Sequence, residues 1–136
     1  MSNVKTLSIC GSMQFFKKMQ ELKIQLEKFG YSVYLPEAEE SESFYLSLPK
    51  AERPSLKRKF IDTHIEKIRK SDAVIITNYR KQEIGGYVGS NTLMEIAFAF
   101  AFRKDIYMLN PMDDQPCKDE IDGLGVKWLD GNLGNI

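Results

Sequence analysis

The sequence is poor in the residues that mark disulfide-rich and metal-binding proteins. Among its 136 residues are two cysteines, Cys10 and Cys117, which lie far apart, and one histidine. Neither cysteine belongs to a CxxC or His-rich motif, so the pattern excludes a disulfide framework and favours a reducing compartment. We expect no zinc site, no other metal and no cofactor.

Long apolar runs and an excess of one charge are also absent. No run approaches the ~18 to 20 apolar residues that cross a bilayer, and no signal-peptide pattern is evident. Lys and Arg together number 19, as do Asp and Glu, so the formal net charge is zero. A basic surface for nucleic acid is therefore not indicated. We expect a cytoplasmic protein that binds neither membranes nor nucleic-acid polymers.

Short apolar runs alternate with amphipathic stretches along the chain. The length and the 43% hydrophobic content fit one compact domain over residues 1–136. The pattern predicts an α/β fold, a single-domain doubly wound (Rossmann/flavodoxin-like) five-stranded parallel sheet with the order 2-1-3-4-5. The expected strands lie at residues 6–10, 32–35, 73–77, 106–109 and 126–129.

The first and third strands are neighbours in that order, and ligands bind where their carboxyl ends meet. The first strand ends in Cys10-Gly11-Ser12, and the third leads to the glycine-rich segment 85–92. We therefore expect both turns to border one crevice. The Gly11-Ser12 turn either places N–H groups and a hydroxyl where an anion binds, or is only a tight turn.

Glu95 is the one acid in the helical segment that follows the glycine-rich turn, and seven uncharged residues come after it. Ser90 or Asn91 is the expected N-cap of this helix. Glu95 has two interpretations. It either reaches back to a free backbone N–H as part of a capping box, or it is a carboxylate held at the mouth of the sheet as a nucleophile.

His64 lies on the apolar side of a helix expected over residues 54–70. It is either a histidine at the edge of the core, satisfied by one hydrogen bond, or a site residue. The segment 36–54 before that helix shows no clear period, and its aromatic residues leave two interpretations open: a solvated excursion or a flap over the site.

Three stretches resemble one known family, the nucleoside 2-deoxyribosyltransferase-like superfamily, which includes the 2′-deoxynucleoside 5′-monophosphate N-glycosidases. They are the strand ending in Cys10-Gly11-Ser12, the segment 71–74 (SDAV) and the segment 94–99 (MEIAFA). The last one looks like the family's G-x-x-x-E-[LI]-G-x-A-x-A segment. The resemblance implies that Glu95 attacks C1′ of the sugar and forms a glycosyl-enzyme ester, which water or a second base then opens.

The resemblance also implies where the substrate binds and which group serves the base. The expected binding residues come from the two turns: Cys10, Gly11, Ser12, Gly89, Ser90 and Asn91. His64 stands eight residues before Asp72, where the family often has an aspartate that serves the base. A histidine can do this acid work near neutral pH.

Two positions depart from the family pattern. Ser8 stands where relatives have an aromatic hydroxyl that orients the nucleophile, and Gln14 stands where monophosphate-specific members have an arginine. Recognition of a 5′-phosphate would then rest on Ser12, Ser90, Asn91 and backbone N–H groups.

Relatives build their site from two subunits, so the resemblance implies a homodimer. Phe98, Phe100 and Phe102 are the candidate contact residues, unless they only pack against the sheet. Two rival interpretations of the function remain. The first is a cytokinin phosphoribohydrolase-like enzyme, whose P-G-G-x-G-T-x-x-E turn is similar to segment 85–90, and the second is a non-catalytic nucleotide-sensing module. In each case the partner is a small nucleoside or nucleotide.

Overall fold

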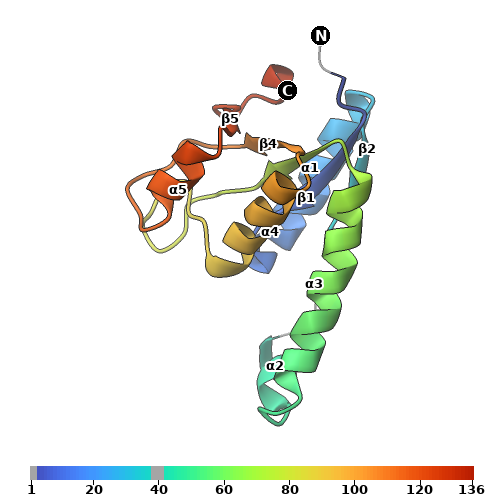
Figure 1. Cartoon of the computed structure of the whole chain (residues 1–136), viewed down its shortest axis with the longest axis vertical. Coiled ribbons are helices and arrows are strands. Elements are labelled where there is room, and N and C mark those ends of the chain that lie inside the picture. Colours follow the sequence, from blue (N-terminus) through green and yellow to red (C-terminus); the bar gives the residue numbers. More distant parts are fainter. Residues whose placement is uncertain (1–2, 38–41) are drawn as a thin grey trace.

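The computed structural model describes residues 3–37 and 42–136 (Figure 1). The elements in chain order are β1 (Thr6–Cys10), η1 (Met13–Phe15), α1 (Phe16–Lys28), β2 (Ser32–Tyr34), α2 (Glu42–Ser47), α3 (Arg53–Lys70), β3 (Ala73–Ile76), α4 (Ser90–Ala101), β4 (Asp105–Met108), α5 (Lys118–Gly123), β5 (Lys127–Trp128) and η2 (Leu133–Asn135). None of the helices in these two ranges is long and apolar enough to cross a membrane.

The sheet is parallel throughout and has the order β2-β1-β3-β4-β5, which confirms the predicted α/β topology. The register pairs Cys10 with Ile76 and Ile76 with Met108. The carboxyl ends of β1, β3 and β4 therefore meet at one edge. All four residues of β3 are buried, as expected for a central strand covered on both faces.

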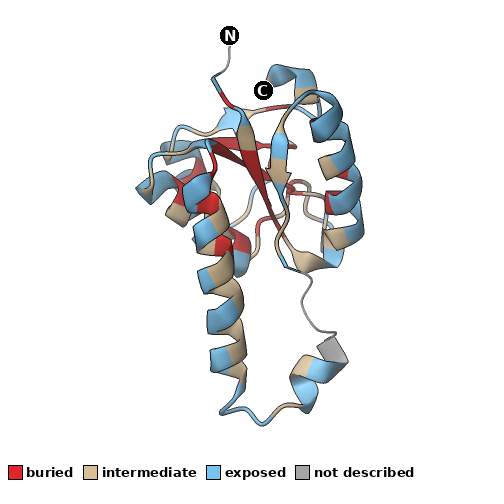
Figure 2. Ribbon diagram, turned by 90° about the vertical axis from the view of Figure 1, so that its right-hand side faces the viewer, coloured by how far each residue is buried: buried red, intermediate tan, exposed pale blue. Residues whose placement is uncertain are grey.

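Helices cover both faces of the sheet, and each face has its own core. Leu7 and Ile9 of β1 point toward α1 and pack with Met19, Leu22 and Leu26. Ala73 and Ile75 of β3 belong to the same core. The alternate strand residues Cys10, Val74 and Ile76 point to the other face and pack with residues of α3, α4 and α5, among them Ile68, Ile96, Ala99 and Ile121. Figure 2 shows the buried strands between these two layers.

The first helical region, between β1 and β2, consists of a 3-10 turn and a regular helix. A 3-10 turn over Met13–Phe15 precedes α1, and the Ser12 side chain accepts a hydrogen bond from the N–H of Gln14 at its start. Phe29 is exposed because α1 ends one residue earlier and the chain turns at Gly30 with φ +98°.

The segment 36–54 contains a helix that the sequence pattern did not predict. This helix, α2, has six residues, too few to show a periodicity. Residues 38–41 of the segment lie outside the described residues. As Figures 1 and 2 show, α2 lies at the far end of α3, whose N-terminal half extends away from the sheet. Pro54 lies in the first turn of α3, as expected, and only His64 and Ile68 of that helix are buried.

Candidate functional site

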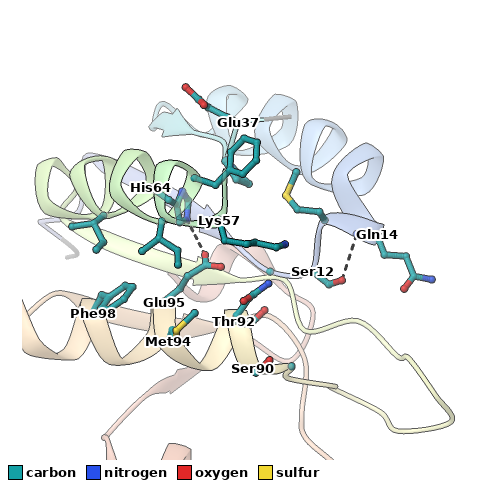
Figure 3. Close-up of a pocket in the computed structure, with 18 of the residues that line it drawn as sticks. Ser12, Gln14, Glu37, Lys57, His64, Ser90, Thr92, Met94, Glu95 and Phe98 are labelled. Atoms are coloured by element: carbon teal, nitrogen blue, oxygen red, sulfur yellow. Dashed lines mark hydrogen bonds and ion pairs between the residues drawn. The ribbon is translucent and has the colours of Figure 1, made fainter. Parts of the chain in front are cut away.

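A pocket of about 350 Å³ opens at the carboxyl edge of the sheet, between α3, α4 and the turns after β1 and β3. It falls in the size range of small-molecule sites. The pocket is lined by all the predicted site residues except Cys10, namely Gly11, Ser12, His64, Gly89, Ser90, Asn91 and Glu95 (Figure 3). The two turns therefore border one cavity, as the predicted strand order requires.

Close approach of two strands explains the glycine in the first turn. A Cβ at Gly11 would lie only 2.0 Å from the hydroxyl oxygen of Thr77, just after β3. That hydroxyl donates a hydrogen bond to the carbonyl of Cys10 at 3.0 Å. A larger residue at position 11 would push the turns apart, so the shape of the pocket depends on this glycine.

The helix that carries Glu95 is not capped as expected. Its N-cap is Gly89, with extended backbone, and no side chain caps it, so the expectation of Ser90 or Asn91 was wrong. Glu95 is the sixth residue of α4, which is too far along for a capping box. The capping-box interpretation is therefore contradicted.

The Glu95 carboxylate instead points across the pocket to His64 on α3. Oε2 of Glu95 lies 2.8 Å from Nε2 of His64, and the side chains are 17% and 9% exposed. The distance is that of an ion pair, but the atoms are not aligned as a hydrogen bond, and neither Oε2 nor His64 Nδ1 has a hydrogen-bond partner among the described residues. The contact is therefore mainly electrostatic; Oε2 is buried against His64, and Glu95 also lines the pocket.

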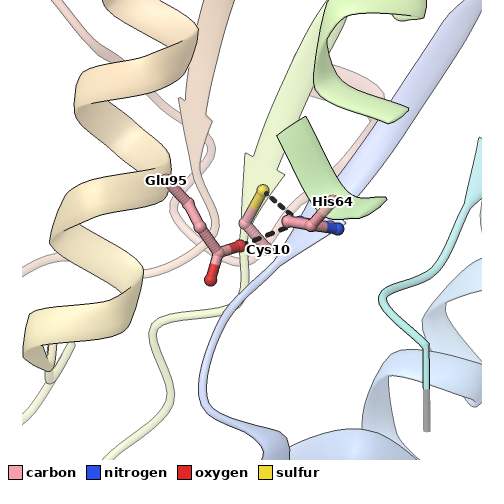
Figure 4. A group of neighbouring side chains, drawn as sticks. All are labelled: Cys10, His64 and Glu95. Atoms are coloured by element: carbon pink, nitrogen blue, oxygen red, sulfur yellow. Dashed lines mark hydrogen bonds and ion pairs between the residues drawn. The ribbon is translucent and has the colours of Figure 1, made fainter. Parts of the chain in front are cut away.

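Cys10 completes this cluster from strand β1 (Figure 4). Its Sγ lies 3.3 Å from His64 Nε2, and the residue is fully buried, so it supports the pair and does not line the pocket. Burial, followed by the negative charge of Glu95 and a hydrogen bond with it, raises the pKa of the Cys10 thiol. The thiol is therefore protonated at neutral pH.

The same three side chains could hold a metal ion, since their ligand atoms all lie within 4.8 Å of one another. A metal here would have to displace the proton of the fully buried Cys10 thiol and break its 3.3 Å contact with His64 Nε2. It would also occupy the carboxylate that faces the pocket. The arrangement is therefore better suited to holding Glu95 in place than to binding a cation.

Ser8, which stands where relatives have an aromatic hydroxyl, does not approach Glu95. Its hydroxyl lies 2.6 Å from that of Ser71, and Ser71 in turn donates to the carbonyl of Lys67 at 2.7 Å. These hydrogen bonds satisfy both buried hydroxyl groups at the C-terminal end of α3. His64 is the side chain that meets the carboxylate in this protein.

Sequence reasoning missed Lys81 and the apolar residues that line the pocket. Lys81 lies in the polar segment after β3, and its Nζ is 3.4 Å from the hydroxyl oxygen of Ser12. Phe60, Ile61 and Ile65 of α3 form an apolar wall. A lysine in a loop carries no periodic signal, and the only available clue was that its loop leaves the carboxyl end of a central strand.

The three aromatic residues of α4 lie in different environments. Phe98 lines the pocket, and Phe102 packs against the core under the guanidinium of Arg69, which is 4.6 Å from its ring centroid. Phe100 is 51% exposed. Packing against the protein therefore accounts for two of the three residues, and Phe100 is available for a contact with a second molecule.

No protein-family model and no curated protein matches the chain. Several solved structures share its fold, including the following three. A 2-deoxyribosyltransferase from Bacillus psychrosaccharolyticus is 13% identical over 82% of this chain and 76% of that chain, with a TM-score of 0.51. A CMP N-glycosidase from Clostridium botulinum is 22% identical over 91% and 87%, with a TM-score of 0.55. A 2-deoxyribosyltransferase from Leishmania mexicana is 17% identical over 96% and 87%, with a TM-score of 0.51. The resemblance to this superfamily is confirmed at the level of the fold.

Proposed function

We propose that this chain, which has the fold of the nucleoside 2-deoxyribosyltransferase-like superfamily, cleaves the N-glycosidic bond of a nucleoside or its 5′-monophosphate, with Glu95 as the nucleophile. One observation carries the proposal. The Glu95 carboxylate is mostly buried, is held 2.8 Å from His64, and faces a pocket of about 350 Å³ at the carboxyl edge of the sheet. The activities named for the three similar structures support the reaction class.

The reaction proceeds in two displacements. A carboxylate oxygen of Glu95 forms a bond to C1′ while the C1′–N bond breaks, and the electron pair of that bond leaves with the base, which takes up a proton. The product of this step is a glycosyl ester on Glu95. Water then attacks C1′ and releases the sugar, or the nitrogen of a second base attacks and forms a new nucleoside; either step restores the carboxylate.

His64 acts first as a positioning residue for Glu95. Its Nε2 lies 2.8 Å from Oε2 of the nucleophile itself, so the ring fixes the position of the carboxylate at the pocket. The sequence interpretation gave His64 the task of protonating the base. The contact supports positioning. As the bond from Glu95 to C1′ forms and the charge of the carboxylate is lost, a proton on Nε2 can pass to the base in the same step, while the C1′–N bond breaks.

A homodimer in the cytoplasm is part of the proposal. The two free cysteines fit a reducing compartment. Phe44 and Leu46 on α2 are large exposed apolar residues, as is Phe100 on α4. These side chains are the candidate contact residues of the dimer. The molar mass in solution from light scattering tests the dimer: twice the chain mass of 15.6 kDa supports it, and a monomer contradicts it.

The decisive experiment compares wild type with Glu95→Ala on a panel of nucleosides and 5′-monophosphates, with the free base quantified by chromatography. Glu66→Ala is the matched control, because Glu66 is an exposed acid on α3 that pairs with Arg69 outside the pocket. We expect base release by wild type and by the control, and loss of release in Glu95→Ala. Unchanged release in Glu95→Ala would reject the nucleophile.

The same panel separates the rival functions. A nucleotide-sensing module would bind ligands in the pocket, measurable by calorimetry, without releasing base from any of them. A phosphoribohydrolase-like enzyme would release base from ribonucleotides and leave deoxyribonucleotides intact. Neither rival is favoured by a contact in the structure, whereas the Glu95–His64 pair favours a nucleophilic carboxylate.

A further inference from the structure

We propose that the polar end of the pocket binds the 5′-phosphate of the substrate and that Lys81 supplies the positive charge, so that the preferred substrate is a nucleoside 5′-monophosphate. The inference rests on the proposed function. Monophosphate-specific relatives have an arginine at the position of Gln14, so this chain lacks that positive charge. The inference assigns the charge to Lys81 instead, a residue that the sequence pattern did not single out. Four features of the described residues support it.

The first feature is the turn that presents Lys81. Lys81 and Ile84 pair in both directions, with N–H to carbonyl distances of 3.1 and 2.9 Å. The two residues between them, Gln82 and Glu83, have φ values of 53° and 62°. This is a two-residue hairpin of type I′, built without the usual glycine or asparagine. Strained backbone of this kind persists only where the surroundings hold it, and it concentrates at functional sites.

The second feature is the anchoring of this hairpin. The carboxylate of Asp113 accepts a hydrogen bond from the N–H of Gly85 at 2.8 Å, and the Asp113 N–H donates to the Gly85 carbonyl at 2.8 Å. The side chain of Gln115 accepts from the N–H of Val88 at 2.9 Å and donates to the carbonyl of Gly86 at 3.1 Å. The segment after β4 thus fixes the hairpin, and the position of Lys81 is set before a ligand binds.

The third feature is the environment of the Lys81 ammonium. Its Nζ lies 3.4 Å from the Ser12 hydroxyl oxygen and 5.6 Å from the centroid of the Tyr87 ring. No carboxylate in residues 3–37 or 42–136 forms an ion pair with it. The only histidine of the chain is already paired with Glu95. Lys81 is therefore a partly buried cation in the pocket without an anionic partner.

The fourth feature is what faces Lys81 across the pocket. α4 begins there at Gly89 without a side-chain cap, which leaves the first N–H groups of the helix open to a ligand. The hydroxyl of Ser90 and the amide of Asn91 also line the cavity. A helix N-terminus favours an anion, and the lysine adds a full charge to the same space.

The order of groups along the pocket agrees with a monophosphate. In Figure 3 the Glu95 carboxylate lies between the polar residues Ser12 and Ser90 on one side and His64 and Phe98 on the other. A sugar with C1′ over Glu95 places its 5′ substituent and its base on opposite sides of that carboxylate. The phosphate then meets Ser12 and Lys81, and the base meets the apolar wall.

The test is kcat/KM for one base presented as nucleoside and as 5′-monophosphate, with wild type, Lys81→Met and Lys81→Arg. Lys28→Met is the matched control, because Lys28 is exposed at the end of α1 and does not line the pocket. We expect wild type to prefer the monophosphate. Lys81→Met should lose about 10- to 100-fold on the monophosphate alone, the usual effect of a lost charge-assisted hydrogen bond. Lys81→Arg should retain most of the preference.

Nucleoside cleavage by Lys28→Met should equal that of wild type, and thermal melts of all four proteins control for folding. Two results would overturn the inference and leave the proposed function standing: equal cleavage of nucleoside and monophosphate by wild type, or an equal loss on both substrates in Lys81→Met. Absence of base release from every substrate would instead reject the proposed function.

Discussion

The two faces of the sheet are packed in opposite ways. The face under α1 is apolar, with Leu7, Ile9 and Leu26 at its centre. The face under α3 and α4 buries polar groups beside its apolar core, among them Ser8, His64 and Ser71. Both layers rest on the same strands, because successive residues of a strand point to opposite faces.

The difference separates stability from chemistry. Apolar side chains under α1 need no hydrogen-bond partners, and their packing tolerates only substitutions that conserve volume. Buried polar groups under α3 and α4 each need a partner, and those without one mark the site: His64 Nδ1 and Glu95 Oε2 are the orphaned side-chain atoms among the described residues. Substitutions under α3 and α4 should therefore lower activity and leave stability intact, and substitutions under α1 should do the opposite.

Glu95→Gln should have the largest effect. Loss of the nucleophile should lower kcat by about 10⁴-fold or more, as for other nucleophiles that act as part of a unit. The melting temperature should change little, because Gln has the shape of Glu and its amide can still contact His64 Nε2. Steady-state assays and thermal melts measure the two quantities. A variant that stays active would contradict the role of Glu95 in the chemistry, and one that unfolds would show that this face of the sheet also determines stability.

Leu26→Ala tests the opposite face. Leu26 is fully buried under α1, so the cavity should lower the free energy of unfolding by about 2–5 kcal/mol. kcat of the folded variant should equal that of wild type, because α1 supplies no side chain to the Glu95 cluster. Urea titration gives the stability. A fall in kcat below the melting transition would show that the α1 face takes part in the chemistry.

His64→Ala and His64→Gln together test positioning against proton transfer. Gln can place an amide nitrogen near the position of Nε2, so it should retain most of the activity if His64 only holds Glu95. His64→Ala should lose about 10- to 100-fold. If both variants lose activity alike, and mainly with poor leaving bases, the ring transfers a proton; the dependence of kcat on pH would then lose one limb in both.

The thiols should react in the order of their exposure. Cys10 is fully buried, and burial followed by the Glu95 charge raises its pKa, whereas Cys117 is partly exposed and has a pKa raised mainly by desolvation. An alkylating reagent at pH 8 should therefore modify Cys117 alone in the folded protein, and both residues in urea. Mass spectrometry of the modified peptides measures this. Rapid labelling of Cys10 without denaturant would contradict its burial and would show that the core under α3 and α4 becomes accessible to solvent in the folded protein.

Asp72→Asn should have the smallest effect, because Asp72 lies at the opposite edge of the sheet. Its carboxylate accepts hydrogen bonds from the N–H groups of Lys5 and Thr6 at 2.8 and 2.9 Å, and these bonds lower its pKa from 3.8. Since the folded pKa is the lower one, the stabilisation is present above about pH 4 and is lost as the pH falls through the folded pKa. The variant should lose about 1 kcal/mol at pH 7 and approach wild type near pH 2 in urea titrations. A difference that grows on acidification would contradict this role.

Much of the fold could be predicted from the sequence because its signals are local. Strand β3 is a continuous apolar run, and the strand order follows from alternating strands and helices with right-handed connections. The same logic placed Gly11, Ser12, Gly89 and Glu95 at one crevice. The helix α2 was missed because six residues show no period, and the strand ends shifted by a residue.

The sequence by itself determined that a lone carboxylate follows a glycine-rich turn at the switch point of a parallel sheet. Only the tertiary structure decided that this carboxylate meets His64 and Cys10 and not its own backbone, and that Lys81 reaches Ser12. The physical reason is distance along the chain. These contacts join residues from different strands, helices and loops, whose side chains are brought within 4 Å only when both layers pack on the sheet.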